Sequence, residues 1–309
     1  MRKAFVETLT QLVKKDKDIY LFTGDLGFSV FDEFKEMFPD NYLNVGLSES
    51  NMIGMAAGMA LRDKQVFVYS IVPFIIYRAL EQIRNDLCYQ ELPVKIVGVG
   101  EGLSYGVAGT THHALEDIAI MTALPNMTVI APGDPLEVKY AVKESLNLKG
   151  PCYIRLGKTG ESLLYKQNSI PFKIGKAITV KEGEDIFLIA TGNMLETALE
   201  VSKILERENI SSEVVSMHTI KPIDENAIIK SAKNVKMIVS IEEHSIMGGL
   251  GSKIADVLVK NSIDTKLVKF GLPDNFIHIV GSRDYLREHY GLLPNQIAKK
   301  IIKTWREIV

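Results

Sequence analysis

The carboxylate of Glu49 is the first side chain whose position suits proton transfer. It follows a short apolar run at residues 42–45 and comes just before a Gly- and Ala-rich helical stretch at residues 53–62. Open α/β sheets bind ligands at the carboxyl ends of their strands, so a carboxylate placed there can act on a ligand. The alternative is structural, with Ser48 and Glu49 capping the helix, which is the commoner role of an acid at a helix start.

Two aromatic residues, Phe74 and Tyr77, follow the next apolar run at residues 66–69. They are three residues apart and share one face of a helical turn. Such a face can stack on a planar ligand, although two aromatics at helical spacing more often belong to a core.

A glycine-rich loop at residues 100–117 contains the paired histidines His112 and His113. Loops that directly follow a strand tend to carry function, and histidine exchanges protons near neutral pH. We therefore favour a functional loop over two solvated histidines.

Short runs rich in Val and Ile alternate with stretches of helical length through the first half of the chain. Several runs are apolar on both faces, as in a parallel sheet covered by helices on each side. Strands are predicted at residues 19–22, 42–45, 66–69, 94–99, 127–131 and 152–156, and helices at 53–62, 75–88 and 137–146. This pattern predicts a doubly wound α/β domain over residues 1–165.

The alternation lapses at residues 157–175, where Gly, Ser and polar residues predict a linker. It then restarts, and we expect a second, smaller α/β domain over residues 172–309. Its strands are predicted at residues 186–190, 212–217, 236–241 and 266–270, and its helices at 196–208, 226–231, 251–260 and 294–305.

Composition argues against several classes of protein. The 309-residue chain has a formal net charge of −2 and no Lys/Arg cluster that would attract nucleic acid or an anionic membrane. No apolar run is long enough to span a bilayer, and the N-terminus lacks the features of a signal peptide. We interpret Cys88 and Cys152 as reduced, buried thiols and find no metal-binding spacing. The expected location is cytoplasmic.

Several segments, in order along nearly the whole chain, resemble the transketolase family. Those in the first domain are residues 46–52 (GLSESNM), 109–113 (GTTHH), 131–134 (APGD) and 150–155 (GPCYIR). In the second domain, residues 242–249 (EEHSIMGG) and 271–276 (GLPDNF) are similar to the C-terminal half of deoxyxylulose-phosphate synthase. Several motifs in order are far more specific than one, so the functional interpretations of Glu49, Phe74 and His112 outweigh the structural ones.

The resemblance implies a pyrimidine-binding thiamine-diphosphate domain followed by a transketolase C-terminal domain. The implied activity is a transferase that moves a two-carbon ketol unit from a ketose to an aldose. Glu49 would hydrogen-bond the pyrimidine nitrogen of the cofactor, so that the exocyclic nitrogen can take the thiazolium C2 proton. Phe74 would stack on the pyrimidine with Tyr77 beside it, and His112 would contact the bound sugar.

Four more residues match family positions. Asp25 and Ser29 would line the cofactor or acceptor channel. Arg155 and Lys158 are predicted to clamp an acceptor phosphate, since Arg suits a bidentate contact. The alternative that both cations are solvated at the surface stays open.

The motif that holds the diphosphate in this family, Gly-Asp-Gly with a downstream Asn, is missing. Residues 24–27 (GDLG) come nearest, but they resemble the start of the pyrimidine-binding domain. The resemblance therefore implies a separate N-terminal diphosphate-binding transketolase subunit, which also holds Mg²⁺ or Ca²⁺, and a split enzyme of α2β2 type, a heterotetramer.

Departures from the family pattern leave the sugar or sugar-phosphate substrate open. Ala108 stands where an acid is usual, Gly100 replaces a transketolase histidine and Glu101 replaces an arginine of the synthase. An atypical sugar from specialised carbohydrate metabolism would account for this loop. The alternatives are a pyruvate-decarboxylating synthase, which the missing arginine disfavours; a 2-oxoacid dehydrogenase beta subunit, which the loop fits less well; and a non-catalytic partner, which the retained Glu49 disfavours.

Overall fold

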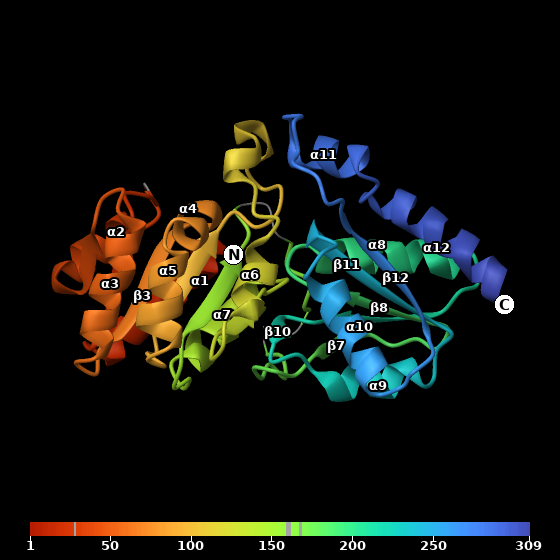
Figure 1. Ribbon diagram of the computed structural model, residues 1–309, viewed down its shortest axis with the longest axis horizontal. Coiled ribbons are helices and arrows are strands. Elements are labelled where there is room, and N and C mark those ends of the chain that lie inside the picture. The colour runs from red at the N-terminus through yellow and green to blue at the C-terminus, as the bar shows by residue number, and fades with distance from the viewer. Residues whose placement is uncertain (28, 159–161, 167–168) are drawn as a thin grey trace.

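The structure is a computed structural model that describes residues 1–27, 29–158, 162–166 and 169–309. Two α/β domains lie side by side along its longest axis (Figure 1). Their sheets have 7 and 5 strands and are mainly parallel. The predicted fold class, a doubly wound α/β domain followed by a smaller α/β domain, is confirmed.

The first sheet has the strand order β10-β5-β6-β4-β3-β1-β2. Every neighbouring pair is parallel except β10 and β5. Its strands are β1 (Ile19–Thr23), β2 (Tyr42–Asn44), β3 (Gln65–Ile71), β4 (Lys95–Val99), β5 (Thr128–Ile130), β6 (Cys152–Leu156) and β10 (Thr219–Lys221). All six strands predicted in the first half of the sequence are present.

Helices cover both faces of this sheet. On one face lie α1 (Arg2–Lys15), α2 (Asp32–Met37) and α7 (Pro135–Ser145); on the other lie α3 (Glu49–Ala60), α4 (Val72–Tyr77), α5 (Leu80–Gln82) and α6 (Asp117–Ala123). The side chains of β3 alternate between the faces, as a strand requires. Phe67 and Tyr69 join the core under α1, and Val66 and Val68 join the core under α3.

The predicted helix at residues 75–88 is in fact broken. The helix α4 ends at Tyr77, α5 begins at Leu80, and a π-helical segment, η2 (Ile83–Cys88), follows. Arg78 and Ala79 form the break. Such irregular helical turns often occur at functional sites, and Arg78 is part of the site described below.

The second sheet has the order β12-β11-β8-β9-β7, with only β7 antiparallel to its neighbour. Its strands are β7 (Ile178–Lys181), β8 (Ile186–Ala190), β9 (Ser212–Ser216), β11 (Met237–Ser245) and β12 (Lys266–Leu272). Helices α9 (Glu225–Ala232) and α10 (Leu250–Lys260) pack on one face, and α8 (Met194–Arg207), α11 (Arg283–His289) and α12 (Pro294–Ile308) on the other.

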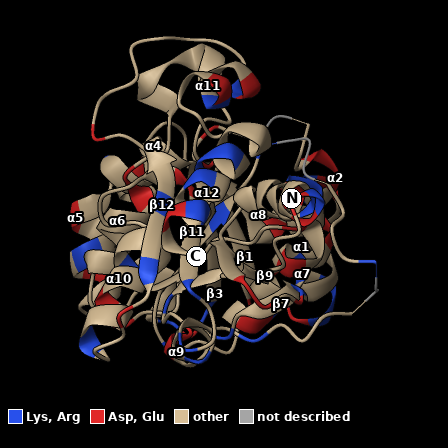
Figure 2. Cartoon of the chain, turned by 90° about the vertical axis from the view of Figure 1, so that its right-hand side faces the viewer, with Lys and Arg blue, Asp and Glu red and all other residues tan. Residues whose placement is uncertain are grey.

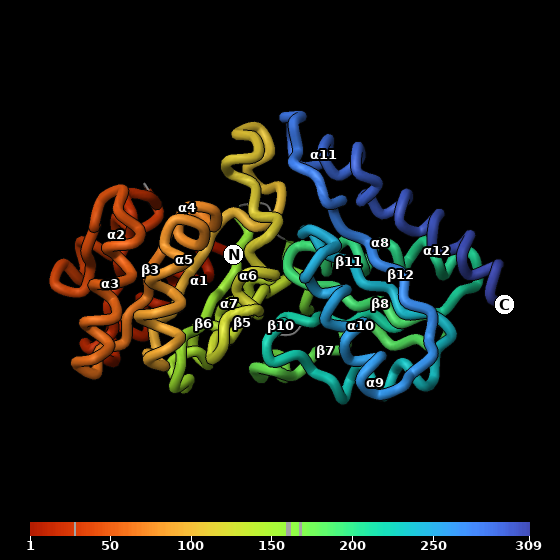
Figure 3. Tube along the Cα trace, viewed as in Figure 1, coloured from red at the N-terminus to blue at the C-terminus, as the bar shows by residue number. Residues whose placement is uncertain are grey.

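The two domains share a sheet and a core. The strand β10 comes from the second half of the chain but pairs with β5 of the first sheet, with Thr219 opposite Ile130 (Figure 3). The apolar core under α3 continues into the second domain through Phe187, Val215 and Ile238. Burial of one continuous core fixes the domains relative to each other.

The described residues between β6 and β7 form no helix or strand, and residues 159–161 and 167–168 of the predicted linker lie outside the described part.

Cys88 and Cys152 are free and buried, as predicted, and burial raises the pKa of these thiols to about 11 and about 12. No helix within the described ranges is long and apolar enough to cross a membrane. Basic and acidic residues are interspersed along the elements of the chain (Figure 2).

Candidate active site

Most of the predicted site residues lie at the carboxyl ends of the parallel strands of the first sheet. Asp25 follows β1, Glu49 follows β2, and Phe74 in α4 follows β3. The loop after β4 carries two short 3₁₀ turns, η3 (Gly106–Ala108) and η4 (Thr110–His112). Figure 1 shows this loop and α4 at the top of the first domain. This is the edge at which open α/β sheets bind their ligands.

The Glu49 carboxylate is buried, with 2% of the residue exposed, in the first turn of α3. Its Oε1 accepts a hydrogen bond from Ser70 Oγ at 3.4 Å, and Arg78 Nη1 donates to both carboxylate oxygens at 3.3 and 3.2 Å. The side chain of Ser48 makes no capping bond. The hydrogen bonds of Glu49 are thus directed into the site, and the capping interpretation is not supported.

Arg78, Phe74 and His112 extend the site from Glu49 toward the glycine-rich loop. The guanidinium carbon of Arg78 lies 4.0 Å from the centre of the Phe74 ring. The Phe74 ring in turn contacts the His112 ring at 5.1 Å between centroids, close to edge-on. The structure therefore brings together the predicted residues Glu49, Phe74 and His112, with Arg78 between Glu49 and Phe74.

The run of contacts continues through Tyr105. Its ring lies 6.1 Å from that of His112, and Lys158 Nζ lies 4.4 Å from the centre of the Tyr105 ring. Lys158 is thus connected to the site through the ring of Tyr105, and its predicted role as a phosphate clamp stays a prediction. The sequence analysis missed both Arg78, although it directly follows Tyr77, and Tyr105, which stands inside the glycine-rich loop.

Tyr77 ties α4 to the end of this loop. Its hydroxyl donates to Glu116 Oε2 at 2.7 Å, and burial and the nearby carboxylates of Asp117 and Glu116 raise the pKa of Tyr77 well above its usual value. The phenol therefore stays protonated and keeps its hydrogen bond at any physiological pH. Its predicted position beside the cofactor stays a prediction.

Asp25 and Ser29 lie on the loop after β1. Asp25 and Asn44 exchange two hydrogen bonds, at 2.9 and 3.0 Å. The backbone of Asp25 has φ 54° and that of Ser29 has φ 61°, which is uncommon for residues other than glycine. Such conformations persist where the surroundings enforce them, often at binding sites, and the channel roles of both residues stay predictions.

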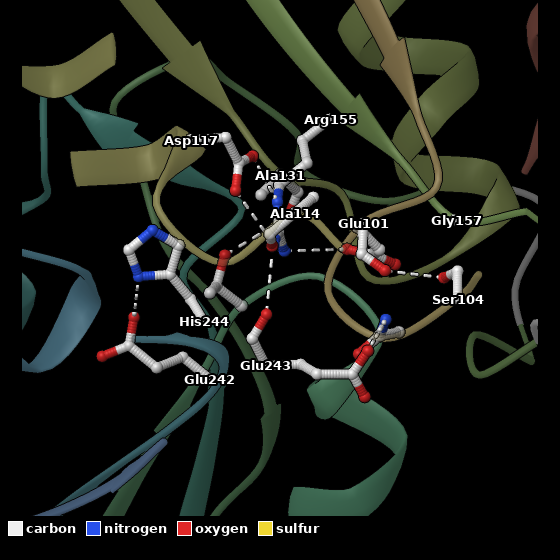
Figure 4. A network of polar contacts seen from close by, with 12 residues as sticks. Glu101, Ser104, Ala114, Asp117, Ala131, Arg155, Gly157, Glu242, Glu243 and His244 are labelled. Carbon is white, nitrogen blue, oxygen red and sulfur yellow. Dashed lines mark hydrogen bonds and ion pairs between the residues drawn. The ribbon is translucent and has the colours of Figure 1, made fainter. Parts of the chain in front are cut away.

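Both sequence-based interpretations of Arg155, a phosphate clamp and a solvated cation, are wrong. The residue is 1% exposed, and its guanidinium lies between the domains (Figure 4). It donates to Asp117 at 2.7 and 3.2 Å and to Glu101 at 3.3 Å. Burial alone would lower the pKa of Arg155, but Asp117 and Glu101 outweigh burial and raise it, so the guanidinium stays charged.

The same guanidinium holds both ends of the glycine-rich loop. Arg155 Nη2 donates to the carbonyl of Ala114 at 2.8 Å and to that of Glu243, in β11, at 3.1 Å. Glu101 stands at the start of the loop and Asp117 at its end. Arg155 thus joins β6, both loop ends and the second domain.

Glu243 fastens the loop from the side of the second domain. Its carboxylate accepts the backbone N–H of Leu103 at 2.8 Å and pairs with Arg283 at 3.1 Å and with Arg287. Gly102 has φ +57°, and a Cβ there would lie 2.2 Å from Glu243 Oε1, so only glycine allows this approach. Above this point, Thr110 Oγ1 donates to the carbonyl of Ile277, so the second domain also supports the turn that bears His112.

Comparison with known proteins assigns the family. Residues 1–160 match the pyrimidine binding domain of transketolase, and residues 175–297 match the transketolase C-terminal domain. The chain is 41% identical over 309 residues to a putative transketolase C-terminal section of Methanocaldococcus jannaschii, covering 99% of this chain and 96% of the relative. It is 35% identical over 304 residues to an apulose-4-phosphate transketolase subunit of Phocaeicola vulgatus, covering 98% and 96%.

Among solved structures, a split-gene transketolase described as an inactive beta4 tetramer matches with a TM-score of 0.91 at 36% identity, covering 100% of this chain and 99% of that chain. The chain belongs to the transketolase family. The class of protein predicted from the sequence, the C-terminal subunit of a split transketolase, is confirmed.

Removing the Arg155 guanidinium should be far more costly than removing a surface arginine. Arg155→Met removes the cation that faces the two buried carboxylates of Asp117 and Glu101, so we expect the free energy of unfolding to fall by about 3–5 kcal/mol. Urea denaturation measures this change, and hydrogen exchange should show faster exchange of the amides of residues 100–117. Arg306→Met, which breaks an exposed pair with Glu208 at 3.0 Å, is the control and should cost less than about 1 kcal/mol. Equal costs for the two variants would contradict the assigned role.

The contributions of the adjacent acids Glu242 and Glu243 to the free energy of unfolding should change with pH in opposite directions. Burial would raise the pKa of Glu243, but Arg283 and Arg287 lower it to about 2 from its usual 4.5, so its stabilisation is complete above pH 4.5 and is lost as the pH falls toward 2. Burial raises the pKa of Glu242 to about 7 despite backbone hydrogen bonds from Gly251 and Leu250, so its stabilisation is lost as the pH rises from 4.5 to 7.

Unfolding by urea over a pH series measures both effects. The stability deficit of Glu243→Gln relative to the unsubstituted chain should shrink as the pH falls from about 4.5 to about 2. Glu242→Gln should gain stability relative to that chain between about pH 4.5 and 7. Parallel pH profiles for both variants would show that these pKa assignments are wrong.

Proposed function

We propose that this chain supplies the pyrimidine-binding half of a thiamine-diphosphate site in a two-subunit transketolase. The assembled enzyme would transfer a two-carbon ketol unit from a ketose to an aldose. The observation that carries the proposal is that one side chain, Arg78, contacts both the buried Glu49 carboxylate and the Phe74 ring, at the carboxyl ends of β2 and β3.

The surroundings of Glu49 fit the pyrimidine end of the cofactor. A planar group, the Arg78 guanidinium, lies 4.0 Å over the Phe74 ring while it donates to Glu49 at 3.2 Å. An aminopyrimidine is also planar and can make the same two contacts, by stacking on the ring and by hydrogen bonding to the carboxylate.

The residues of this chain do not fit the diphosphate end. Within the described ranges, no group of three or more His, Cys, Asp or Glu side chains could hold a metal ion. The sequence also lacks the Gly-Asp-Gly motif that the family uses. The missing motif supports a partner, the N-terminal transketolase subunit, that binds the diphosphate and its Mg²⁺ or Ca²⁺.

Exposed apolar side chains near the site also support a partner chain. The exposed fractions of Val107, Phe276 and Val280 are 75%, 70% and 60%, and the two segments that bear them touch where Thr110 binds the carbonyl of Ile277. Apolar side chains gathered at one place on a surface often mark an interface. The related structure is named an inactive beta4 tetramer, and one relative is named as a transketolase subunit, so we infer that this chain also works with a partner, in an α2β2 assembly.

Thiamine diphosphate, when bound, supplies the nucleophilic carbon and the electron sink for breaking and making a carbon–carbon bond beside a carbonyl. Glu49 would share a proton with the pyrimidine nitrogen, and its burial strengthens that hydrogen bond. Phe74 would fix the plane of the ring. His112, whose Nδ1 lies 3.0 Å from Thr111 Oγ1, would hydrogen-bond a sugar hydroxyl or transfer its proton. Lys158 is the remaining candidate for an acceptor phosphate, with Asp25 and Ser29 on the neighbouring loop.

The structure gives a reason to favour a sugar donor over pyruvate. Glu101 stands where the synthase has an arginine, and it is buried against Arg155 rather than directed into the site. The chain therefore offers no cation at that position for the carboxylate of pyruvate.

Reconstitution tests the proposal. This chain and the diphosphate-binding subunit, assayed together with thiamine diphosphate and Mg²⁺, should transfer two carbons from ketose phosphates to aldoses, whereas the chain alone should be inactive. Glu49→Gln in the same complex should lower turnover by more than about tenfold, a barrier change of about 1.4 kcal/mol. Release of carbon dioxide from pyruvate would contradict the transketolase assignment, and activity of the chain alone would contradict the split site.

A further inference from the structure

Resting on the proposed function, we propose that Arg78 is an internal mimic of the pyrimidine ring. Its guanidinium occupies the place against Glu49 and Phe74 that the ring requires, and the cofactor binds only when this side chain swings away.

The two contacts of Arg78 are the two contacts that a pyrimidine would make. The guanidinium is planar, lies 4.0 Å over the Phe74 ring and donates to both oxygens of Glu49 at 3.3 and 3.2 Å. A second planar group cannot take the same ring face and the same carboxylate at the same time. Arg78 and the cofactor therefore compete for one position.

The Arg78 side chain is free to leave, but its backbone is not. The side chain is 50% exposed, whereas that of Glu49 is 2% exposed. The backbone is held because the Arg78 carbonyl accepts a hydrogen bond from Ser50 Oγ at 2.9 Å, at the break between α4 and α5. The deeply buried Arg155 is the contrast, since its guanidinium is fixed by five hydrogen bonds.

The replacement of Arg78 by the cofactor keeps the buried Glu49 carboxylate hydrogen-bonded both before and after the cofactor binds. A buried carboxylate without a partner destabilises a fold, and Arg78 supplies the partner until the cofactor does. The competition lowers the affinity for the cofactor. Only molecules in which Arg78 has moved away can bind it, so the apparent affinity is the intrinsic affinity multiplied by the fraction of such molecules. A half-exposed ion pair together with a stacked guanidinium should lower the affinity by about tenfold.

Calorimetric titration of thiamine diphosphate, with Mg²⁺, into the assembled two-subunit enzyme tests the inference without an activity assay. We expect Arg78→Ala to bind the cofactor about tenfold more tightly than the unsubstituted enzyme, because the competitor is gone. Arg84→Ala is the matched control, since Arg84 is exposed in η2 and its side chain hydrogen-bonds the neighbouring Asn85. Its cofactor affinity should be unchanged.

Methylguanidinium provides a second readout that a merely structural arginine would not affect. At millimolar concentration it should weaken cofactor binding by Arg78→Ala toward the unsubstituted value, whereas methylammonium, which is not planar, should not. Equal or weaker cofactor binding by Arg78→Ala, or no response to methylguanidinium, would overturn this inference alone. A complete lack of cofactor binding by the unsubstituted complex would overturn the proposed function and this inference with it.

Discussion

The rest of the architecture depends on the ion pairs and hydrogen bonds of the buried Arg155 guanidinium. A charge without solvent is tolerated only when it is fully compensated, and Arg155 is compensated by Asp117, Glu101 and two backbone carbonyls. These partners come from both ends of the glycine-rich loop and from β11 of the second domain. The second domain therefore cannot shift without uncovering charge, and the loop with His112 cannot move independently of it.

This constraint explains how a domain that contains none of the predicted site residues contributes to the site. The predicted site residues Glu49, Phe74 and His112 lie beyond the carboxyl ends of β2, β3 and β4. The second domain acts on this site through the loop, by the Glu243 contact to Leu103 and the Thr110 contact to Ile277. The shared strand β10 and the continuous core make that support rigid. One half of the chain holds the groups that would react, and the other half fixes the loop beside them.

The sequence predicted what depends on local pattern. Apolar runs located six strands of the first sheet, and the family resemblance singled out Glu49, Phe74 and His112, which the structure connects through Arg78 and ring contacts. The sequence did not predict the position of Arg155, because an arginine in a strand has the same local pattern whether it faces solvent or a domain interface. Its partners Asp117, Glu101 and Glu243 are also distant in sequence, at 38, 54 and 88 residues. The three-residue β10 gives no periodic signal, and its pairing with β5 is a tertiary effect. Arg78 was missed because its position depends on a helix break that periodicity did not show.

The central claim is that Glu49 makes the cofactor reactive from within a half-site. Deuterium exchange of the thiazolium C2 proton, followed by NMR after rapid quenching of the assembled enzyme, measures that step without any sugar. The account predicts that Glu49→Gln slows this exchange by about a hundredfold or more, a barrier change of about 2.7 kcal/mol. An exchange rate within about tenfold of the unsubstituted enzyme would contradict it, because cofactor activation would then not depend on this carboxylate.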